Sequence, residues 1–259
     1  MKKDGDHKQT LQWPLLLHPD DESTPFPPAE LAMHNPNGLL AVGGSLSPSR
    51  LELAYRSGIF PWFSEGQNIL WWSPDPRAIL FPEKIRISRS LRQSLRRKGL
   101  HVVFDRAFEK VMRACAAPRE ADAGTWITES MIKAYTQLHR RGIAHSVEVY
   151  RDDKLIGGLY GVALGALFFG ESMFSRERDG SKIALVWLAA QLQQWGYHAI
   201  DCQLPSDHLL GLGAEIMPRH EFLELLKVAL VKPGRQDQWQ FDADLELVPK
   251  TTTSMPRVP

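Results

Sequence analysis

Glu171 lies in the middle of an otherwise apolar stretch, FFGESMFS. An ionisable side chain in such a run is costly to bury unless a partner pairs with it or the protein uses it. Asp201 and Gln203 stand two positions apart in IDCQ, another short segment. On a strand both would share one face, and a carboxylate beside an amide can orient an amine and take its proton. A polar pair that fixes a loop through hydrogen bonds explains the same residues equally well.

Cations are concentrated in KIRISRSLRQSLRRKG, residues 84–99, which contains no acid. Arg89, Arg92 and Arg96 recur at the spacing of one helix face, which indicates a cationic ridge on an amphipathic helix. Most such ridges are solvated helix faces. The absence of acids favours the alternative, a surface that contacts phosphates.

Several aromatic side chains are separated by Gly, Pro and polar residues, so they form no helical stripe: Trp62, Phe63, Trp71, Trp72 and Trp126. Tryptophans of this kind most often pack against loops. The alternative is a platform on which unpaired bases stack, as recognition of single-stranded nucleic acid requires.

Familiar cofactor and nucleophile motifs are not found. GESMF fails the G-x-S-x-G pattern because its fifth residue is Phe174. GGLYGVALG has neither the glycine order of a dinucleotide loop nor the lysine of a P-loop. None of the nine histidines has H-E-x-x-H or comparable spacing. We therefore expect no metal and no cofactor.

The overall composition is that of a folded chain without a strong charge bias. Of 259 residues, 43% are apolar, and 31 lysines and arginines oppose 30 acids. The two cysteines are far apart, which argues against a disulfide framework. The apolar part of LQWPLLLHPDDE is too short for a signal peptide or a membrane span. These features predict a cytoplasmic protein without a membrane contact, and we expect it to act as a monomer.

The segments that carry these residues predict the elements that position them. SVEVY, LIGGLYGVAL and LFFGESMFS, separated by turns, indicate a three-stranded meander. A helix with Ser181 as its cap, the short strand AIDCQ and a final helix, RHEFLELLKVAL, follow. Ser47 and Pro48 begin one helix in an amino-terminal region with otherwise little regular structure. The fold class is therefore α+β, with helices packed on a sheet.

We expect a flexible tail at residues 1–12, a small domain at 13–76, a larger domain at 77–240 and a second tail at 241–259. NPNGLLAVGGSLSPSRLELAYRSGIFPWF, ILWWSPDPRAIL, TWIT, HSVEVY, GGLYG, FFGESMFS, IDCQ and HLLGLGA occur in this order. Together they closely resemble the leucyl/phenylalanyl-tRNA–protein transferase family, from about residue 26 to about residue 226.

The resemblance implies that the larger domain has a GNAT-like acyltransferase fold with a mixed sheet. It also implies the reaction: leucine, phenylalanine or, less well, methionine moves from aminoacyl-tRNA to the amino-terminal Arg or Lys of an acceptor protein. The product is marked for degradation by the N-degron pathway. The aminoacyl ester is already activated, so the reaction needs no cofactor.

Residue by residue, the resemblance implies that Trp62 and Trp126 hold the terminal adenosine of the tRNA, and that the arginines of the cationic ridge meet the acceptor stem. It implies an apolar pocket for the transferred side chain, formed by Leu159, Met173, Leu188, Leu192 and Ile200. It identifies Asp201 and Gln203 as a catalytic pair beside Tyr55 and Glu171. We expect Asp201 to polarise Gln203, whose carbonyl oxygen then accepts a hydrogen bond from the attacking amine.

Two other functions are compatible with parts of the sequence. An acetyl-CoA-dependent N-acetyltransferase would need a glycine-rich pyrophosphate loop, and SRERDGSK before the long helix lacks that pattern. A module that binds the tRNA end without catalysis would use the ridge and the aromatics, and would not need Asp201 or Gln203.

Overall fold

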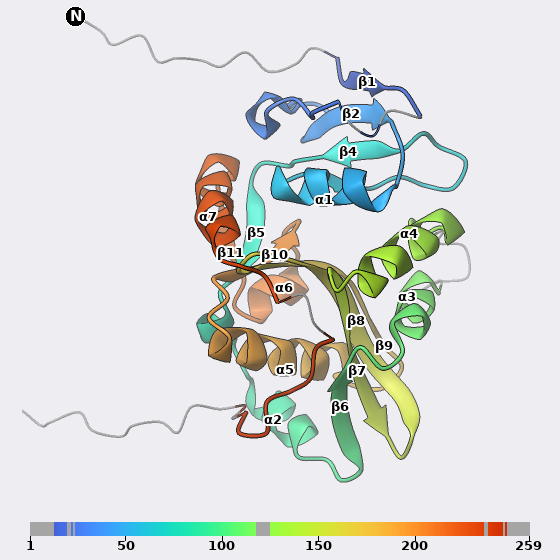
Figure 1. Ribbon diagram of the computed structural model, residues 1–259. Coiled ribbons are helices and arrows are strands. Elements are labelled where there is room, and N and C mark those ends of the chain that lie inside the picture. Colours follow the sequence, from blue (N-terminus) through green and yellow to red (C-terminus); the bar gives the residue numbers. More distant parts are fainter. Residues whose placement is uncertain are drawn as a thin grey trace, which may run out of the picture.

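The computed structural model describes residues 13–19, 22, 24–117, 125–235, 238–245 and 247, and these form two separate β-sheets (Figure 1). The first sheet has the order β1-β2-β4-β3. Its strands are short: β1 Leu15–Leu17, β2 Leu39–Gly43, β3 Phe60–Pro61 and β4 Leu70–Trp72. The expectation of little regular structure in the amino-terminal region was therefore wrong, since these strands pair across loops and carry little local signal.

Helix α1, Pro48–Arg56, packs beneath the first sheet (Figure 1). Its predicted start is confirmed, because the Ser47 side chain accepts a hydrogen bond from the backbone N–H of Arg50 at 3.3 Å. A short 3-10 turn, Ala29–Leu31, precedes β2.

The second sheet has seven strands in the order β11-β5-β10-β9-β8-β7-β6. β9 and β10 are parallel and the other neighbours are antiparallel, so the sheet is mixed. The strands are β5 Arg77–Leu80, β6 Leu100–Phe104, β7 Ala144–Arg151, β8 Lys154–Leu164, β9 Leu167–Ser175, β10 Ala199–Gln203 and β11 Glu215–Met217. The predicted meander is confirmed as β7-β8-β9.

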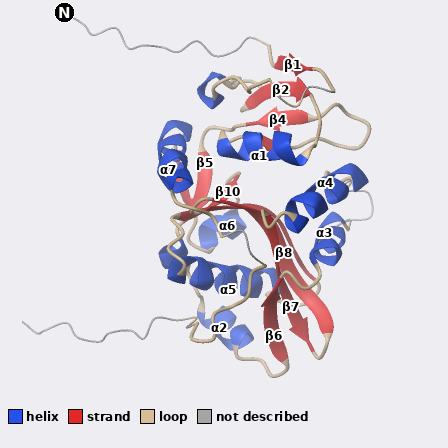
Figure 2. Cartoon of the chain, in the orientation of Figure 1, coloured by secondary structure: helices blue, strands red, loops and turns tan. Residues whose placement is uncertain are grey.

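Helices cover both faces of the second sheet (Figure 2). Side chains of neighbouring residues alternate between two hydrophobic clusters, as the pleat requires: Leu159 and Phe168 pack on the side of α5, whereas Tyr160 and Phe169 pack on the side of α3 and α4. The helices are α2 Arg89–Leu95, α3 Phe108–Ala116, α4 Glu129–Arg140, α5 Gly180–Gln194, α6 Asp207–Gly211 and α7 Arg219–Val231, with a 3-10 turn at Pro82–Lys84. The expected α+β class with a mixed, helix-flanked sheet is confirmed.

The residue that caps α5 differs from the expectation. Asp179, in a left-handed conformation with a φ of 67°, precedes the helix, and Ser181 lies inside its first turn. The backbone N–H of Ser181 donates to the hydroxyl of Ser175 at 2.8 Å. The cap was misplaced because a serine just before a helix and a serine within its first turn give the same local pattern.

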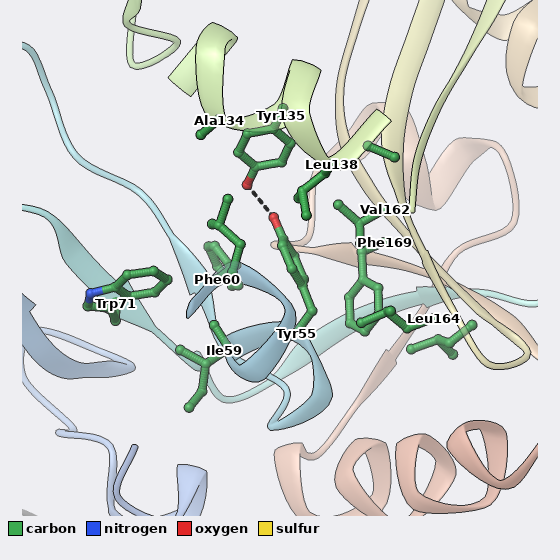
Figure 3. Packing of buried hydrophobic residues seen from close by; sticks show 14 of the residues in the cluster. Tyr55, Ile59, Phe60, Trp71, Ala134, Tyr135, Leu138, Val162, Leu164 and Phe169 are labelled. Carbon is green, nitrogen blue, oxygen red and sulfur yellow. Dashed lines mark hydrogen bonds between the residues drawn. The ribbon is translucent and has the colours of Figure 1, made fainter. Parts of the chain in front are cut away.

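One hydrophobic core joins the two sheets (Figure 3). The Tyr55 ring of α1 lies 5.0 Å from the ring of Phe169 on β9, measured between centroids, and 6.5 Å from the ring of Tyr135 on α4. β4 ends at Trp72 and β5 begins at Arg77. We propose a domain boundary between residues 76 and 77, because the strands before it belong to the first sheet and those after it to the second. The two domains share one hydrophobic core.

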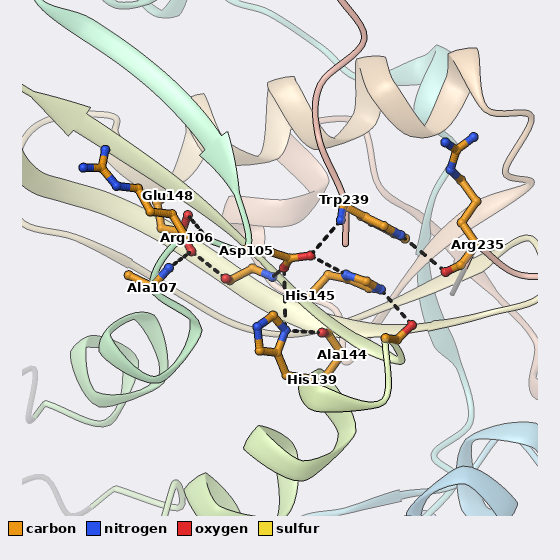
Figure 4. A network of polar contacts seen from close by, with 11 residues as sticks. Asp105, Arg106, Ala107, His139, Ala144, His145, Glu148, Arg235 and Trp239 are labelled. Carbon is orange, nitrogen blue, oxygen red and sulfur yellow. Dashed lines mark hydrogen bonds and ion pairs between the residues drawn. The ribbon is translucent and has the colours of Figure 1, made fainter. Parts of the chain in front are cut away.

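The chain after α7 returns to the second domain. Trp239 is buried, and its ring stacks on the His145 ring at a centroid distance of 3.8 Å. Its backbone N–H donates to the carboxylate of Asp105 at 3.1 Å (Figure 4). Phe241 stacks on Phe104 at 4.0 Å. The boundary expected at residue 241 thus crosses a packed segment, and we propose that residues 238–245 belong to the larger domain. The expected tail at residues 1–12 lies outside the described residues.

Candidate active site

A cavity of about 850 Å³ lies where β9 and β10 part. The two parallel strands pair as far as Phe169 and Asp201 and no further. The cavity is lined by residues that follow these positions on both strands, from Gly170 to Arg176 and from Cys202 to Gln203. Its volume is in the range of small-molecule sites in proteins.

Two β-bulges place polar side chains at this opening. On β9, Ser172 pairs with Tyr160 and Gly170 pairs with Gly161, so Glu171 has no partner across the ladder. On β10, the register with β5 shifts between Asp201 and Gln203. A bulge bends the strand and turns a side chain to a new direction.

The second bulge overturns one expectation. Gln203 has a φ of 63° and lines the cavity, whereas Asp201 is fully buried and lies outside it. The two side chains therefore do not share a face. The reason is that the rule of alternate faces fails where an extra residue interrupts the strand.

Glu171 is the centre of a buried hydrogen-bond network. The Tyr55 hydroxyl donates to its Oε1 at 2.7 Å, and the Tyr135 hydroxyl donates to its Oε2 at 3.3 Å. The two tyrosine hydroxyls also contact each other (Figure 3). The Gln203 side chain donates through Nε2 to Oε1 at 2.9 Å. Burial raises the pKa of Glu171 to about 7, although these hydrogen bonds oppose the rise. This carboxyl group can therefore hold or release a proton near neutral pH.

Asp201 is held by an arginine that the sequence analysis did not single out. The guanidinium of Arg77 donates to both carboxylate oxygens of Asp201, at 3.0 and 2.7 Å, and to the carbonyl of Gly58 at 3.1 Å. It lies 5.0 Å from the centroid of the Phe60 ring. Both members of the ion pair are fully buried. Asp201 in turn accepts the backbone N–H of Gln203 at 2.8 Å. We expected Asp201 to contact the side chain of Gln203, but in the structure it contacts the backbone of Gln203.

The apolar wall of the cavity contains most of the expected residues. Leu159, Met173, Leu188 and Ile200 line it, together with Phe168 and Leu185. Leu192 is buried in the same hydrophobic cluster without lining the cavity. Burial raises the pKa of the Cys202 thiol, another wall residue, so that group stays neutral.

A second cavity, of about 990 Å³, contains the two tryptophans expected at the adenosine. Trp62 is 43% exposed, and its ring lies 5.9 Å from that of Trp72. Trp126 lines both cavities, so they are neighbours. Trp71 is fully buried and donates to the carbonyl of Gly43 at 2.8 Å, which is the packing role given as the alternative for such residues.

Helix α2 carries the cationic ridge. Arg89, Arg92 and Arg96 are exposed, with Arg96 just after the last helical residue. Within the described part of the chain, no ion pair joins them to an acid. Leu91 and Leu95 pack on the cluster around α5, as the amphipathic pattern predicts.

Glu148 lies outside both cavities and binds the backbone that leads into α3. Its carboxylate accepts the backbone N–H groups of Arg106 and Ala107 at 3.1 and 3.2 Å (Figure 4). Burial raises its pKa to about 7. These two backbone hydrogen bonds give the buried Glu148 carboxylate a structural role.

Two residues of the site, Tyr135 and Arg77, were not among those expected from the sequence. Tyr135 occupies the apolar face of an amphipathic helix, where a tyrosine gives no sign of a polar partner. Arg77 begins the buried strand RAIL, and a cation in that setting predicts an acid partner. That signal could have found the ion pair.

No group of three or more His, Cys, Asp or Glu side chains that could hold a metal occurs among the described residues. The helices in those same ranges include none that is long and apolar enough to cross a membrane. The start of α5 packs closely on β8, because a Cβ added to Gly157 would lie 2.5 Å from the Cα of Gly180.

Solved structures similar to the chain include a GCN5-related N-acetyltransferase from Kribbella flavida, at 12% identity and a TM-score of 0.36, covering 64% of this chain and 60% of that one. Another is the carboxy-terminal domain of a putative lysylphosphatidylglycerol synthetase from Agrobacterium fabrum, at 14% identity and a TM-score of 0.37, covering 73% and 58%. The chain spans less than two thirds of either. At these TM-scores the likeness carries no argument about the site.

Sequence comparison is more specific. The family model described as leucyl/phenylalanyl-tRNA protein transferase matches residues 79–227, and the model of that family's amino-terminal domain matches residues 44–75. A leucyl/phenylalanyl-tRNA–protein transferase of Nitrosomonas europaea is 58% identical over 219 residues, which cover 85% of this chain and 93% of that protein. One of Alkalilimnicola ehrlichii is 55% identical over 254 residues, covering 96% and 97%. The chain therefore belongs to the leucyl/phenylalanyl-tRNA–protein transferase family and is an aminoacyltransferase.

Proposed function

We propose that this protein transfers leucine or phenylalanine, and methionine less well, from aminoacyl-tRNA to the α-amino group of acceptor proteins that begin with Arg or Lys. The products would enter the N-degron pathway in the cytoplasm. The enzyme would act as a monomer and without a metal or cofactor, because the ester bond to the tRNA already supplies the activation.

In this reaction the neutral amine of the acceptor attacks the ester carbonyl carbon. A C–N bond forms, the C–O bond to the terminal ribose breaks, and one proton passes from the nitrogen to the ribose oxygen. The protein must hold both substrates in line, exclude water and support this proton transfer.

Gln203 and Glu171 are the groups proposed to do this. Gln203 lines the cavity, and with its Nε2 donating to Glu171, its Oε1 has no hydrogen-bond partner among the described residues. That oxygen is suited to accept a hydrogen bond from the attacking amine. An amide is a weak base, so its role is orientation. Glu171, with a pKa near 7, is suited to accept a proton from the acceptor ammonium.

Asp201 is proposed as a positioning residue. Its carboxylate accepts the backbone N–H of Gln203 and so stabilises the left-handed backbone conformation of that residue. Arg77 in turn fixes the Asp201 carboxylate through hydrogen bonds. Tyr55 is proposed to fix the Glu171 carboxylate.

Leu159, Met173, Leu188 and Ile200 are proposed to hold the side chain of the transferred amino acid, with Leu192 supporting Leu188 from one helical turn away. One methylene in such a pocket is worth about 1–3 kcal/mol, so some transfer of methionine is expected. Trp62 and Trp126 are proposed to stack on the terminal adenosine, and Arg89, Arg92 and Arg96 to contact the acceptor stem.

The observation that carries this proposal is the Glu171–Gln203 pair at the opening of an apolar cavity lined by Trp126. The test is transfer of radiolabelled leucine and phenylalanine from tRNA to a peptide that begins with arginine, with an otherwise identical peptide that begins with alanine as control. Only the first peptide should be labelled. Gln203→Ala should lower the rate about 10- to 100-fold without weakening tRNA binding.

If neither peptide is labelled while charged tRNA still binds, the protein is a binding module and the proposal is wrong. A Gln203→Ala variant with full activity would remove Gln203 from the mechanism. Arg140→Gln, a change of an exposed cation on α4, serves as the matched control for expression and folding.

A further inference from the structure

Arg176 is the first residue after β9, and it lines the apolar cavity. The residue is exposed, and its guanidinium lies 5.5 Å from the centroid of the Phe174 ring. One nitrogen donates to the carbonyl of Leu155 at 3.3 Å. These contacts orient the planar group and occupy one of its five N–H donors. No carboxylate among the described residues pairs with it, so the remaining donors are available to a ligand.

The segment after Arg176 is fastened to helix α2. Arg178 follows two residues later, and its carbonyl accepts a hydrogen bond from Arg97 at 3.4 Å. The Ser94 hydroxyl of α2 donates to the Asp179 carboxylate at 2.7 Å. These two hydrogen bonds hold the segment that contains Arg178 against the end of α2, the helix that carries the cationic ridge.

Acids do not cancel this charge. Asp179 is only 11% exposed, and the nitrogens of Arg178 and Lys182 lie 3.7 and 3.8 Å from it, at the limit of ion pairing. Glu177 is paired with Arg151 at 2.5 Å. The turn between β9 and α5 is therefore a cationic surface.

We propose that Arg176 binds a backbone phosphate of the single-stranded 3′ end of the donor tRNA. The proposal rests on the proposed function, because an aminoacyl ester held at Glu171 brings the last nucleotides of the tRNA to this cavity. Arg178 and Lys182 continue the phosphate contacts toward α2. The fork of a guanidinium matches two phosphate oxygens, which a lysine cannot do.

The test compares two leucine donors: leucyl-tRNA, and leucine esterified to adenosine, which has no phosphate. Arg176→Gln should raise KM for leucyl-tRNA about tenfold and leave kcat unchanged. The slope of log kcat/KM against log salt concentration should become shallower by about 0.7, the value for one phosphate contact on a single strand. Transfer from the adenosine ester should not change. Arg140→Gln should leave both donors unaffected.

An equal loss with both donors would show that Arg176 acts as part of the cavity wall and would overturn the proposal. An unchanged salt slope would overturn it too. Fluorescence anisotropy with uncharged tRNA measures the same slope without any transfer. If the wild-type protein transfers leucine from neither donor, the proposed function fails, and the anisotropy slope still decides whether Arg176 binds phosphate.

Discussion

Glu171→Gln should make the protein more stable than the wild type at alkaline pH and not at acidic pH. In the folded chain the pKa of Glu171 is raised from 4.5 to about 7, chiefly by burial. Between these values the folded chain holds a proton that the unfolded chain has released. Stability therefore falls as pH rises through this window, and the full cost is present above pH 7.

The magnitude follows from the two pKa values. Each tenfold difference in proton affinity corresponds to 1.36 kcal/mol, so the ionised Glu171 costs the folded state about 3 kcal/mol. Glutamine keeps the shape of the side chain and does not ionise. The free energy of unfolding of the variant, minus that of the wild type, should grow by about 2–3 kcal/mol between pH 5 and pH 8.

Urea denaturation at several pH values, followed by tryptophan fluorescence, measures this difference. Glu148 also has a pKa near 7, but it is present in both proteins and its titration cancels. Tyr55→Phe is a second arm: the Tyr55 hydroxyl lowers the pKa of Glu171, so its loss should move the fall in stability to higher pH. A stability difference that does not vary with pH would refute the reasoning.

Three further changes test other parts of the structure. Asp201→Ala leaves the cation of Arg77 unpaired in the core and should cost about 3–5 kcal/mol of stability, measured by chemical denaturation. Leu188→Ala enlarges the cavity and should cost about 2–5 kcal/mol, while competition between the two charged tRNAs should shift toward phenylalanine. Trp239→Ala removes the ring that stacks on His145 and should cost about 3–5 kcal/mol, seen as a lower Tm.

Each of these has an outcome that contradicts it. An Asp201→Ala protein of wild-type stability would mean that the buried ion pair contributes nothing. An unchanged ratio of phenylalanine to leucine in the Leu188→Ala variant would remove that residue from the pocket. A wild-type Tm for Trp239→Ala would show that the segment 238–245 does not stabilise the fold.

Local patterns predicted much of the framework. The β7-β8-β9 meander and helix α7 follow from apolar periodicity, and helix α1 follows from the serine cap that directly precedes it. The pairing of β5 with β10 and β11 joins segments more than a hundred residues apart in the sequence. A strand of four residues is too short for its sequence pattern to predict such a pairing.

The site was harder to predict because its geometry depends on the two bulges. Nothing in IDCQ marks the extra residue that turns Gln203 into the cavity and leaves Asp201 in the core. A buried acid requires hydrogen-bond donors, so the sequence could predict that Glu171 has such partners. It could not predict Tyr135 among the buried tyrosines, because the packing of α4 brings that residue to Glu171.

The core shared by the two sheets has a consequence for biosynthesis. The hydrogen bond between Tyr55 and Glu171 spans 116 positions of the chain. At about 5–20 residues per second, the ribosome needs roughly 6–23 s to make that stretch. Until the end of this interval the buried face of α1 has no complete β9 to pack on. We expect the first elements to leave the ribosome to reach their native packing only after much later ones have arrived, so the order of folding differs from the order of translation.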